Sequence, residues 1–109
     1  MRIGTWNVDY GRGSRNKDRV ELLVSKAADI WVLTETHGDI DLSKTHVAIR
    51  SSKRPALGNP KVNEGSTWVT IWSKFPIINR IDVPDSSRMV AAVFETPIGS
   101  LAVAGVVLP

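Results

Sequence analysis

The distribution of apolar and polar positions predicts two strands near the start of the chain. The segments Arg2–Asn7 and Asp29–Glu35 are both short and rich in strand-forming residues, and the second contains the unbroken apolar run Ile30-Trp31-Val32-Leu33. Such a run is typical of a parallel strand that is covered on both faces. We therefore expect two parallel strands that lie in one sheet and are joined by a helical crossover.

A helical stripe lies between these two strands. Apolar residues recur there at helical spacing: Val20, Leu23, Val24, Ala27 and Ala28. Asn16 is a good N-cap for a helix that begins at Lys17, and Asp18 would lie near the positive end of the helix dipole. The pattern predicts one amphipathic helix that packs on the sheet through this stripe.

The remainder of the chain favours β-structure. Strands are expected at Thr45–Ser51, Thr67–Ser73, Phe75–Val83, Arg88–Thr96 and Ser100–Leu108, the third being an edge element broken by Pro76 and the last two a hairpin. The segment Ser52–Ser66 is too rich in proline, glycine and polar residues for regular structure. The fold class is therefore predicted to be α/β (α+β), a mixed β-sheet with one main helix.

Composition restricts the function classes only in part. A chain of 109 residues with 42% hydrophobic content is expected to form one domain over residues 1–109, and the net charge of +3 weakly favours anionic partners. The absence of cysteine excludes disulfides and thiolate metal sites. We find no secretory leader and no apolar window near the ~20 residues of a membrane span, so we predict a cytoplasmic protein with no membrane partner.

Asn7 and Glu35 are the candidate site residues, because each closes one of the two apolar strands. Parallel strands end at the same edge of a sheet, which is where open α/β sheets bind ligands. The pattern therefore brings an amide and a carboxylate together at one rim. In the alternative interpretation, Asn7 only bonds the following turn and Glu35 is a solvated strand end.

Other residues have a functional and a structural interpretation. Four tryptophans could stack on bases, but their positions on alternating strands favour the core: Trp6, Trp31, Trp68 and Trp72. Four basic residues could meet phosphate, but short basic loops are usually solvated: Arg12, Arg15, Lys53 and Arg54. His37 directly follows the Glu35 strand and is interpreted as an ordinary loop histidine.

Four blocks, taken in order, carry a resemblance to a known family. They are Ile3–Val8, Asp29–Thr36, Gly65–Ile77 and Ala91–Pro109, and together they resemble the opening half of an endonuclease/exonuclease/phosphatase (DNase I-like) domain. The resemblance implies half of a four-layered α/β sandwich, and the activity of a magnesium-dependent phosphoesterase or nuclease-like hydrolase. Its substrate would be a phosphate ester, with nucleic acid and phosphoinositide both open.

The resemblance also implies roles for the two candidate residues. Asn7 would help to arrange the scissile phosphate and the metal site, and Glu35 would be a ligand of Mg²⁺. The chain departs from the family at Thr34, where glutamine is frequent, and at Gly105–Leu108, which lacks a frequent histidine. The aspartate, asparagine and histidine residues of the family's second half have no counterpart here, so we expect weak or absent Mg²⁺ binding and little or no hydrolysis by this chain alone.

Two further expectations concern assembly. The chain stops in an apolar strand, Ser100–Pro109, so we expect a truncation at its C-terminus. An isolated half would leave an apolar sheet face in water around Trp68–Trp72 and Val90–Val107, so we expect a homodimer that covers this face. The alternative function is a non-catalytic interaction module that keeps the fold and works by self-association.

Overall fold

The computed structural model describes residues 1–11, 14–52 and 65–108. Its elements, in chain order, are β1 (Ile3–Asn7), η1 (Asp9–Gly11), α1 (Asn16–Lys26), β2 (Ile30–His37), β3 (Val47–Arg50), β4 (Ser66–Ser73), β5 (Ile77–Ile81), β6 (Met89–Thr96) and β7 (Gly99–Val106). The loop residues Arg12, Lys53 and Arg54 lie outside the described residues, as does most of the predicted loop Ser52–Ser66. No helix in the described ranges is both long and apolar enough to cross a membrane.

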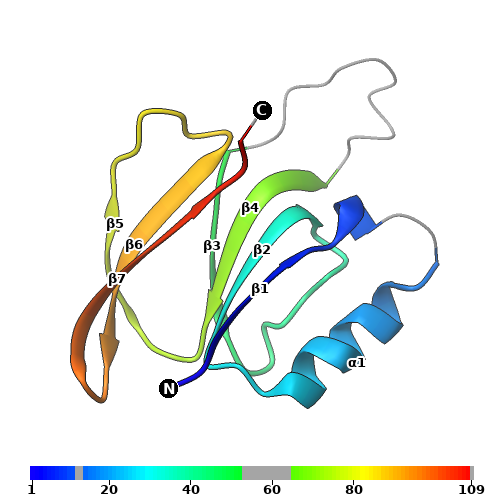
Figure 1. The fold of residues 1–109 in the computed structure, drawn as a ribbon, viewed down its shortest axis with the longest axis horizontal. Helices are drawn as coiled ribbons and strands as arrows, with labels where there is room; N and C mark the ends of the chain where they lie inside the picture. The colour runs from blue at the N-terminus through cyan, green and yellow to red at the C-terminus, as the bar shows by residue number, and fades with distance from the viewer. Residues whose placement is uncertain (12–13, 53–64, 109) are drawn as a thin grey trace.

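The strands form two sheets, which we call sheet A and sheet B. Sheet A has four strands in the order β1-β2-β4-β3, and sheet B has three in the order β5-β6-β7. β1 and β2 are parallel, from Ile3 opposite Ile30 to Asn7 opposite Thr34, and all other pairs are antiparallel. Figure 1 shows α1 on one side of sheet A and sheet B on the other. The predicted α+β class, mixed sheet and parallel strand pair are confirmed.

The first part of the core lies between α1 and sheet A. It is formed by Val8, Leu23, Ala28, Trp31, Leu33, Ile40, Leu42 and Trp72. Gly4 makes room for the Trp31 ring, because a Cβ atom at position 4 would lie 2.3 Å from Trp31 Cζ3. The core assignment of the tryptophans is confirmed for Trp31 and Trp72, whereas Trp6 and Trp68 are half-buried.

The second part of the core lies between the two sheets and consists of Ile30, Ile49, Val69, Ile71, Val90, Ala92 and Phe94. Sheet B approaches sheet A most closely at Gly105, where a Cβ atom would lie 2.5 Å from Val69 Cγ1 and 2.8 Å from Val32 Cγ1. The expectation that the sheet faces around Trp68–Trp72 and Val90–Val107 stand open to water is therefore wrong for these inward residues. The chain folds its own second sheet over the first.

The predicted helix is present, with two local differences. Asn16 is the first helical residue rather than the N-cap, and the preceding Arg15 makes no side-chain capping bond. Asn16 instead accepts a hydrogen bond from Arg19 Nη1 at 2.8 Å, so its side chain is used within the first turn. Val24 is 58% exposed although it belongs to the predicted stripe, because α1 contacts the sheet mainly through Leu23. The helix ends at Lys26, and the C-cap residue Ala27 adopts the left-handed conformation.

Candidate active site at the rim of sheet A

The structure brings the two predicted site residues into direct contact. Asn7 ends β1, and its Nδ2 donates a hydrogen bond to Glu35 Oε2 near the end of β2. The amide oxygen of Asn7 accepts a second hydrogen bond, at 3.1 Å, from the backbone N–H of Asp9. The predicted juxtaposition is thus present, with the amide held between the carboxylate and the following turn. The functional roles of both residues stay predictions.

Regular strand geometry would not have produced this contact. Successive side chains of a strand point to opposite faces of the sheet. Leu33 packs on the α1 side and Val32 on the sheet B side, so Glu35 would face α1 if alternation continued. Asn7 lies opposite Thr34 in the register and would therefore face the other way. A break in the alternation is needed for the two side chains to meet.

The break lies in the backbone of Glu35. Its φ angle is 47°, in the left-handed region that residues other than glycine seldom adopt. Asp9 and Tyr10, which follow the end of β1, also have positive φ angles of 50° and 59°. Strained conformations of this kind cost on the order of 1–3 kcal/mol each and concentrate at functional sites. Three such residues therefore mark this rim as the best candidate for a functional site.

Backbone hydrogen bonds hold the strained rim together. The N–H of Val8 donates to the carbonyl of Thr34 at 3.0 Å, which continues the β1–β2 ladder one step past Asn7. The N–H of Gly11 donates to the carbonyl of Val8 at 3.0 Å and closes the η1 turn. Val8 itself is buried. The turn after β1 is thereby fixed directly beside the Asn7 and Glu35 side chains.

An arginine and a tryptophan lie across the rim from Glu35. The register places Trp68 opposite Glu35, because Thr34 lies opposite Val69 and Thr36 opposite Thr67. The guanidinium carbon of Arg88 lies 3.6 Å from the centre of the Trp68 ring. The sequence analysis did not single out Arg88. Its only signal there was its place as the first residue of the predicted strand Arg88–Thr96.

His37 is the last residue of β2, so the interpretation of it as a loop residue is wrong by one position. Its Nδ1 accepts a hydrogen bond from the backbone N–H of Asp39 at 3.0 Å. A Cβ atom at Gly65 would lie 2.9 Å from His37 Nε2, so the ring lies against the start of β4. These contacts give His37 a structural part in the turn that follows β2.

The described residues do not by themselves form a magnesium site. No group of three or more His, Cys, Asp or Glu side chains that could hold a metal ion occurs within residues 1–11, 14–52 and 65–108. Glu35 offers one carboxylate, and the amide oxygen of Asn7 already accepts a hydrogen bond. Because Mg²⁺ requires octahedral oxygen coordination, this pair can supply only part of its ligands.

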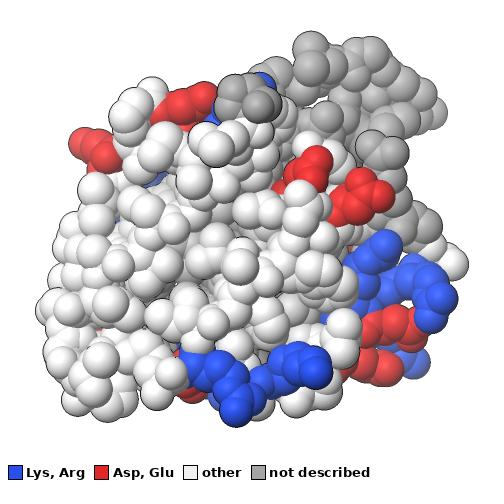
Figure 2. Space-filling model, in the orientation of Figure 1, with Lys and Arg blue, Asp and Glu red and all other residues white. Residues whose placement is uncertain are grey.

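Charge is distributed unevenly around the rim. Figure 2 shows acidic side chains near η1, whereas lysine and arginine gather beside α1 together with further acidic side chains. The acidic residues of β1, η1 and β2 are Asp9 and Glu35. Among the described residues, β1, η1 and β2 contain these two carboxylates and no lysine or arginine, although the whole chain has a net charge of +3. The two carboxylates favour a cation over a bare phosphate at the Asn7–Glu35 pair.

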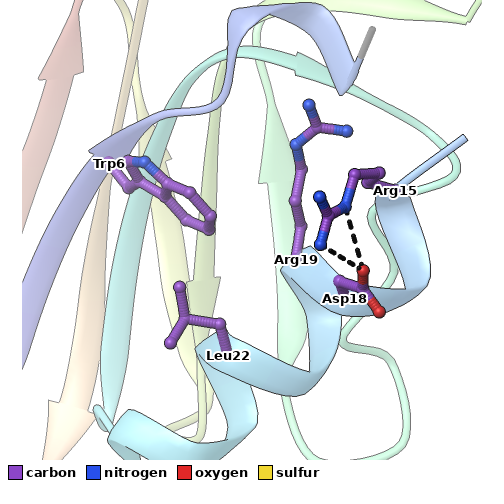
Figure 3. A pocket seen from close by; sticks show the side chains of 5 residues that line it. All are labelled: Trp6, Arg15, Asp18, Arg19 and Leu22. Carbon is purple, nitrogen blue, oxygen red and sulfur yellow. Dashed lines mark hydrogen bonds and ion pairs between the residues drawn. The ribbon is translucent and has the colours of Figure 1, made fainter. Parts of the chain in front are cut away.

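A separate hollow lies between β1 and α1. Figure 3 shows it lined by Trp6, Arg15, Asp18, Arg19 and Leu22. Arg15 turns toward Asp18, which accepts from Arg15 Nε and lies 3.1 Å from its Nη2. Arg15, at the N-cap position of α1, thus forms an exposed ion pair with the first turn of the helix, and its possible phosphate contact stays a prediction. Trp6 contributes the wall of this hollow from the face of β1 opposite Asn7.

Comparisons with known proteins support the architecture. No family model and no curated protein matches the sequence. One similar solved structure is the endonuclease domain of TRAS1, a telomere-specific non-LTR retrotransposon, with a TM-score of 0.65 and 12% sequence identity. The match covers 100% of this chain and 46% of the TRAS1 chain. Another is an endonuclease/exonuclease/phosphatase from Beutenbergia cavernae DSM 12333, with a TM-score of 0.70 and 15% sequence identity. The match covers 99% of this chain and 38% of the Beutenbergia chain.

These similarities establish a shared fold. Identities of 12% and 15% carry no information about the chemistry of single residues. The chain spans less than half the length of each of the two solved structures. The DNase I-like architecture expected from the sequence blocks is confirmed for the described residues, and the activity of a complete domain is a matter for proposal.

Proposed function

We propose that residues 1–109 are one half of a phosphoesterase of the endonuclease/exonuclease/phosphatase type. The single observation that carries the proposal is the hydrogen bond between Asn7 and Glu35, made across the sheet rim by a backbone that departs from regular strand geometry. Three residues beside this hydrogen bond, Asp9, Tyr10 and Glu35, have positive φ angles. Backbone strain of this kind concentrates at functional sites, which favours a functional over a purely structural role for the Asn7–Glu35 pair. The solved structures with nuclease-type titles share the architecture and support this interpretation.

The chemistry of the pair fits a partial site. Hydrolysis of a phosphodiester requires an activated water, positive charge near the phosphate and donors for its non-bridging oxygens. The Asn7 amide can donate to a phosphate oxygen, and Glu35 supplies one anionic ligand for a hard cation. The remaining ligands and the general base would come from polypeptide outside this chain. We therefore expect no measurable hydrolysis by residues 1–109 alone.

A second candidate function is association without catalysis. It is supported by sheet B, whose free edge strand β7 pairs only with β6 among the described strands and carries no charged residue. An uncharged edge strand is a ready template for pairing with another chain. In this alternative the homodimer is the functional state, and sedimentation at micromolar concentration would show a stable dimer whether or not Glu35 is intact.

Thermal melting in the presence of Mg²⁺ tests the proposed function. A ligand that binds only the folded state raises stability by RT ln(1 + [L]/Kd), which is about 1.4 kcal/mol at ten times Kd. We expect the melting temperature of the unaltered chain to rise with Mg²⁺ concentration, and this rise to vanish in Glu35→Ala. Glu95→Ala is the matched control, because Glu95 is an exposed carboxylate on sheet B.

The control variant should keep the full response to Mg²⁺. Equal responses in the unaltered chain, Glu35→Ala and Glu95→Ala would show that Mg²⁺ acts on general surface charge and would contradict the proposed function. If Mg²⁺ changes the melting temperature of none of the three proteins, the second candidate function, association without catalysis, is favoured.

A further inference from the structure

We propose that a second copy of this chain binds along the side of the molecule where β1 and β7 end the two sheets, and that the two copies pair edge to edge about a two-fold axis. The inference rests on the second candidate function, association, and gives it a surface and a partner. It does not depend on the phosphoesterase. It also differs from a homodimer that covers a sheet face, because the contact is made by strand edges.

The free edges of β1 and β7 lie on the same side of the molecule. β1 is the last strand of sheet A, next to β2, and β7 is the last strand of sheet B, next to β6. β7 packs over β2 and β4, whereas β6 packs over β4 and β3. The two sheets therefore run across each other in the same order. β1 and β7 end them on one side, which faces the viewer in Figure 1, and β3 and β5 end them on the other.

Sheet A overhangs sheet B on this side. Because β7 packs over β2 and β4, β1 extends past it by one strand. Gly4 and Trp6 of β1 face the core on the α1 side, so alternation turns Ile3 toward the layer of sheet B. Ile3 is nevertheless 51% exposed. The inner surface of the overhang thus presents an apolar side chain beside the edge of β7.

A stepped side of this shape is complementary to itself. A two-fold axis that runs parallel to the strands exchanges the layer of sheet A with the layer of sheet B. It places the partner's β1 beside β7, in the space under the overhang, and the partner's β7 beside β1. Each sheet of one copy then continues into the other sheet of its partner. This complementarity is the reason that we assign the surface to a second copy.

The backbone of β1 offers hydrogen-bonding groups to this side. Val8 N–H donates to the carbonyl of Thr34 at 3.0 Å, so the backbone groups of Val8 face β2. Successive residues of a strand direct their N–H and C=O groups to opposite sides. The odd-numbered residues of β1 therefore direct these groups away from β2: Ile3, Thr5 and Asn7.

The backbone of β7 does the same. Val107 N–H donates to the carbonyl of Arg88 at 2.9 Å, so Val107 faces β6. By the same alternation Ala102, Ala104 and Val106 direct their N–H and C=O groups away from β6. Neither β1 nor β7 contains a charged residue, and Figure 2 shows an uncharged centre on this face. Edges of this kind bind further strands through main-chain hydrogen bonds.

The opposite side of the molecule is protected against pairing. Arg80 of β5 reaches across to β3, where its Nη2 donates a hydrogen bond to the carbonyl of Arg50 at 2.7 Å. β3 has only four residues, and the register of β5 shifts between Ile77 and Asn79. Short edge strands, bulges and charged side chains all discourage strand addition. A second copy is therefore directed to the side of β1 and β7.

Ile3 and Val47 form a matched pair for the test. They are 51% and 47% exposed, and they lie on the two opposite edge strands of sheet A. Val47 faces the layer of sheet B as Ile3 does, because Ile49, two residues later, belongs to the core between the sheets. Ile3→Lys and Val47→Lys thus introduce the same charge at equivalent places on opposite sides of the molecule.

Sedimentation velocity of the unaltered chain and of both variants tests the inference. The protein is studied in EDTA from about 1 to 100 µM, which resolves dissociation constants in the micromolar range. We expect the unaltered chain and Val47→Lys to sediment as dimers. Ile3→Lys should raise the dissociation constant of the dimer at least about tenfold, because it places an unpaired ammonium group between the copies.

Amide hydrogen exchange locates the contact. In the dimer, the amides of Thr5 and Ala104 should exchange at least about tenfold more slowly than in Ile3→Lys. The amide of Ala48 is the control, because Ser51 N–H donates to Val69 and alternation turns Ala48 away from β4; it should exchange rapidly in both proteins.

A second variant keeps the test open if Ile3→Lys does not fold. Ala104→Pro removes an N–H group that points away from β6, so it breaks no hydrogen bond within sheet B, and proline is tolerated at such an edge position. We expect this variant to fold and to sediment as a monomer. A folded Ala104→Pro that still forms the dimer contradicts pairing through β7.

Three results overturn the inference: a monomer at all concentrations, equal weakening by Ile3→Lys and Val47→Lys, or a dimer in which Thr5 and Ala104 exchange as fast as Ala48. The inference and the phosphoesterase proposal can fail separately, because these assays contain no divalent ion. A monomer with a Glu35-dependent response to Mg²⁺ overturns this inference alone. A dimer without that response retains the association and overturns the phosphoesterase.

Discussion

Sheet A and sheet B are built from similar residues but are covered differently. Sheet A is packed on both faces, by α1 on one side and by sheet B on the other. Sheet B is packed on one face only, and its outward residues include Val93, Ala102, Ala104 and Val106. Figure 2 shows no charged side chains at the centre of the front face, over β7 and β1. Strands that are apolar on both faces are typical of sheets covered on both sides.

The difference separates the residues that fold this chain from the residues of its candidate site. Its core is closed, because both sheets and the helix bury their facing residues within the chain. Among the described residues, the core of sheet B is formed by its inward face, and the Asn7–Glu35 pair is not part of a group that could hold a metal ion. Folding and function therefore depend on different parts of the molecule, and the two parts can be tested separately.

The largest expected effect comes from the core between the sheets. Phe94 is fully buried there, and Phe94→Ala should lower the free energy of unfolding by about 3–5 kcal/mol. Val106, on the outer face, is 47% exposed, so Val106→Ala should cost no more than about 0.5 kcal/mol. Urea unfolding measures both. A comparable cost for Val106→Ala would mean that the outer face of sheet B is covered in solution, as a homodimer built on that face requires.

A smaller effect is expected where the two sheets touch. Gly105→Ala places a methyl group 2.5 Å from Val69 Cγ1 and should lower the unfolding free energy by about 1–3 kcal/mol. Ala104→Val adds methyl groups at the neighbouring position, which is exposed on the outer face, and should be close to neutral. Thermal or urea unfolding of the two variants checks the prediction. Equal stabilities would show that the sheets separate easily at β7.

Much of the fold could be predicted because it depends on local patterns. The runs around Trp6 and Trp31 and the stripe around Leu23 indicated a parallel pair with a helical crossover, and the structure contains both. The covering of sheet A by sheet B could not be predicted in this way, since it depends on packing between distant strands. Its one local signal was Gly105, a glycine inside an apolar strand.

The candidate site could be predicted in part, for a similar reason. Strand ends placed Asn7 and Glu35 at one rim, but the left-handed φ of Glu35, which turns its side chain toward Asn7, has no signature in a residue that is not glycine. The stacking of Arg88 on Trp68 joins two sheets and follows from tertiary packing alone. The sequence thus identifies Asn7 and Glu35, which lie at strand ends. Only the structure identifies the pair of Arg88 and Trp68, which tertiary packing brings to the same end of the sheet.

The central claim is that Asn7 and Glu35 form a functional half-site at the rim. NMR spectra recorded during a titration with Mn²⁺ test it most directly, because this paramagnetic ion broadens the signals of nearby amides and accepts the same oxygen ligands as Mg²⁺. We predict that the amide signals of Asn7, Asp9 and Glu35 broaden first, and that Glu35→Ala removes this preference. Broadening that begins instead at exposed carboxylates such as Asp41 and Asp85, or that is unchanged in Glu35→Ala, would contradict the account.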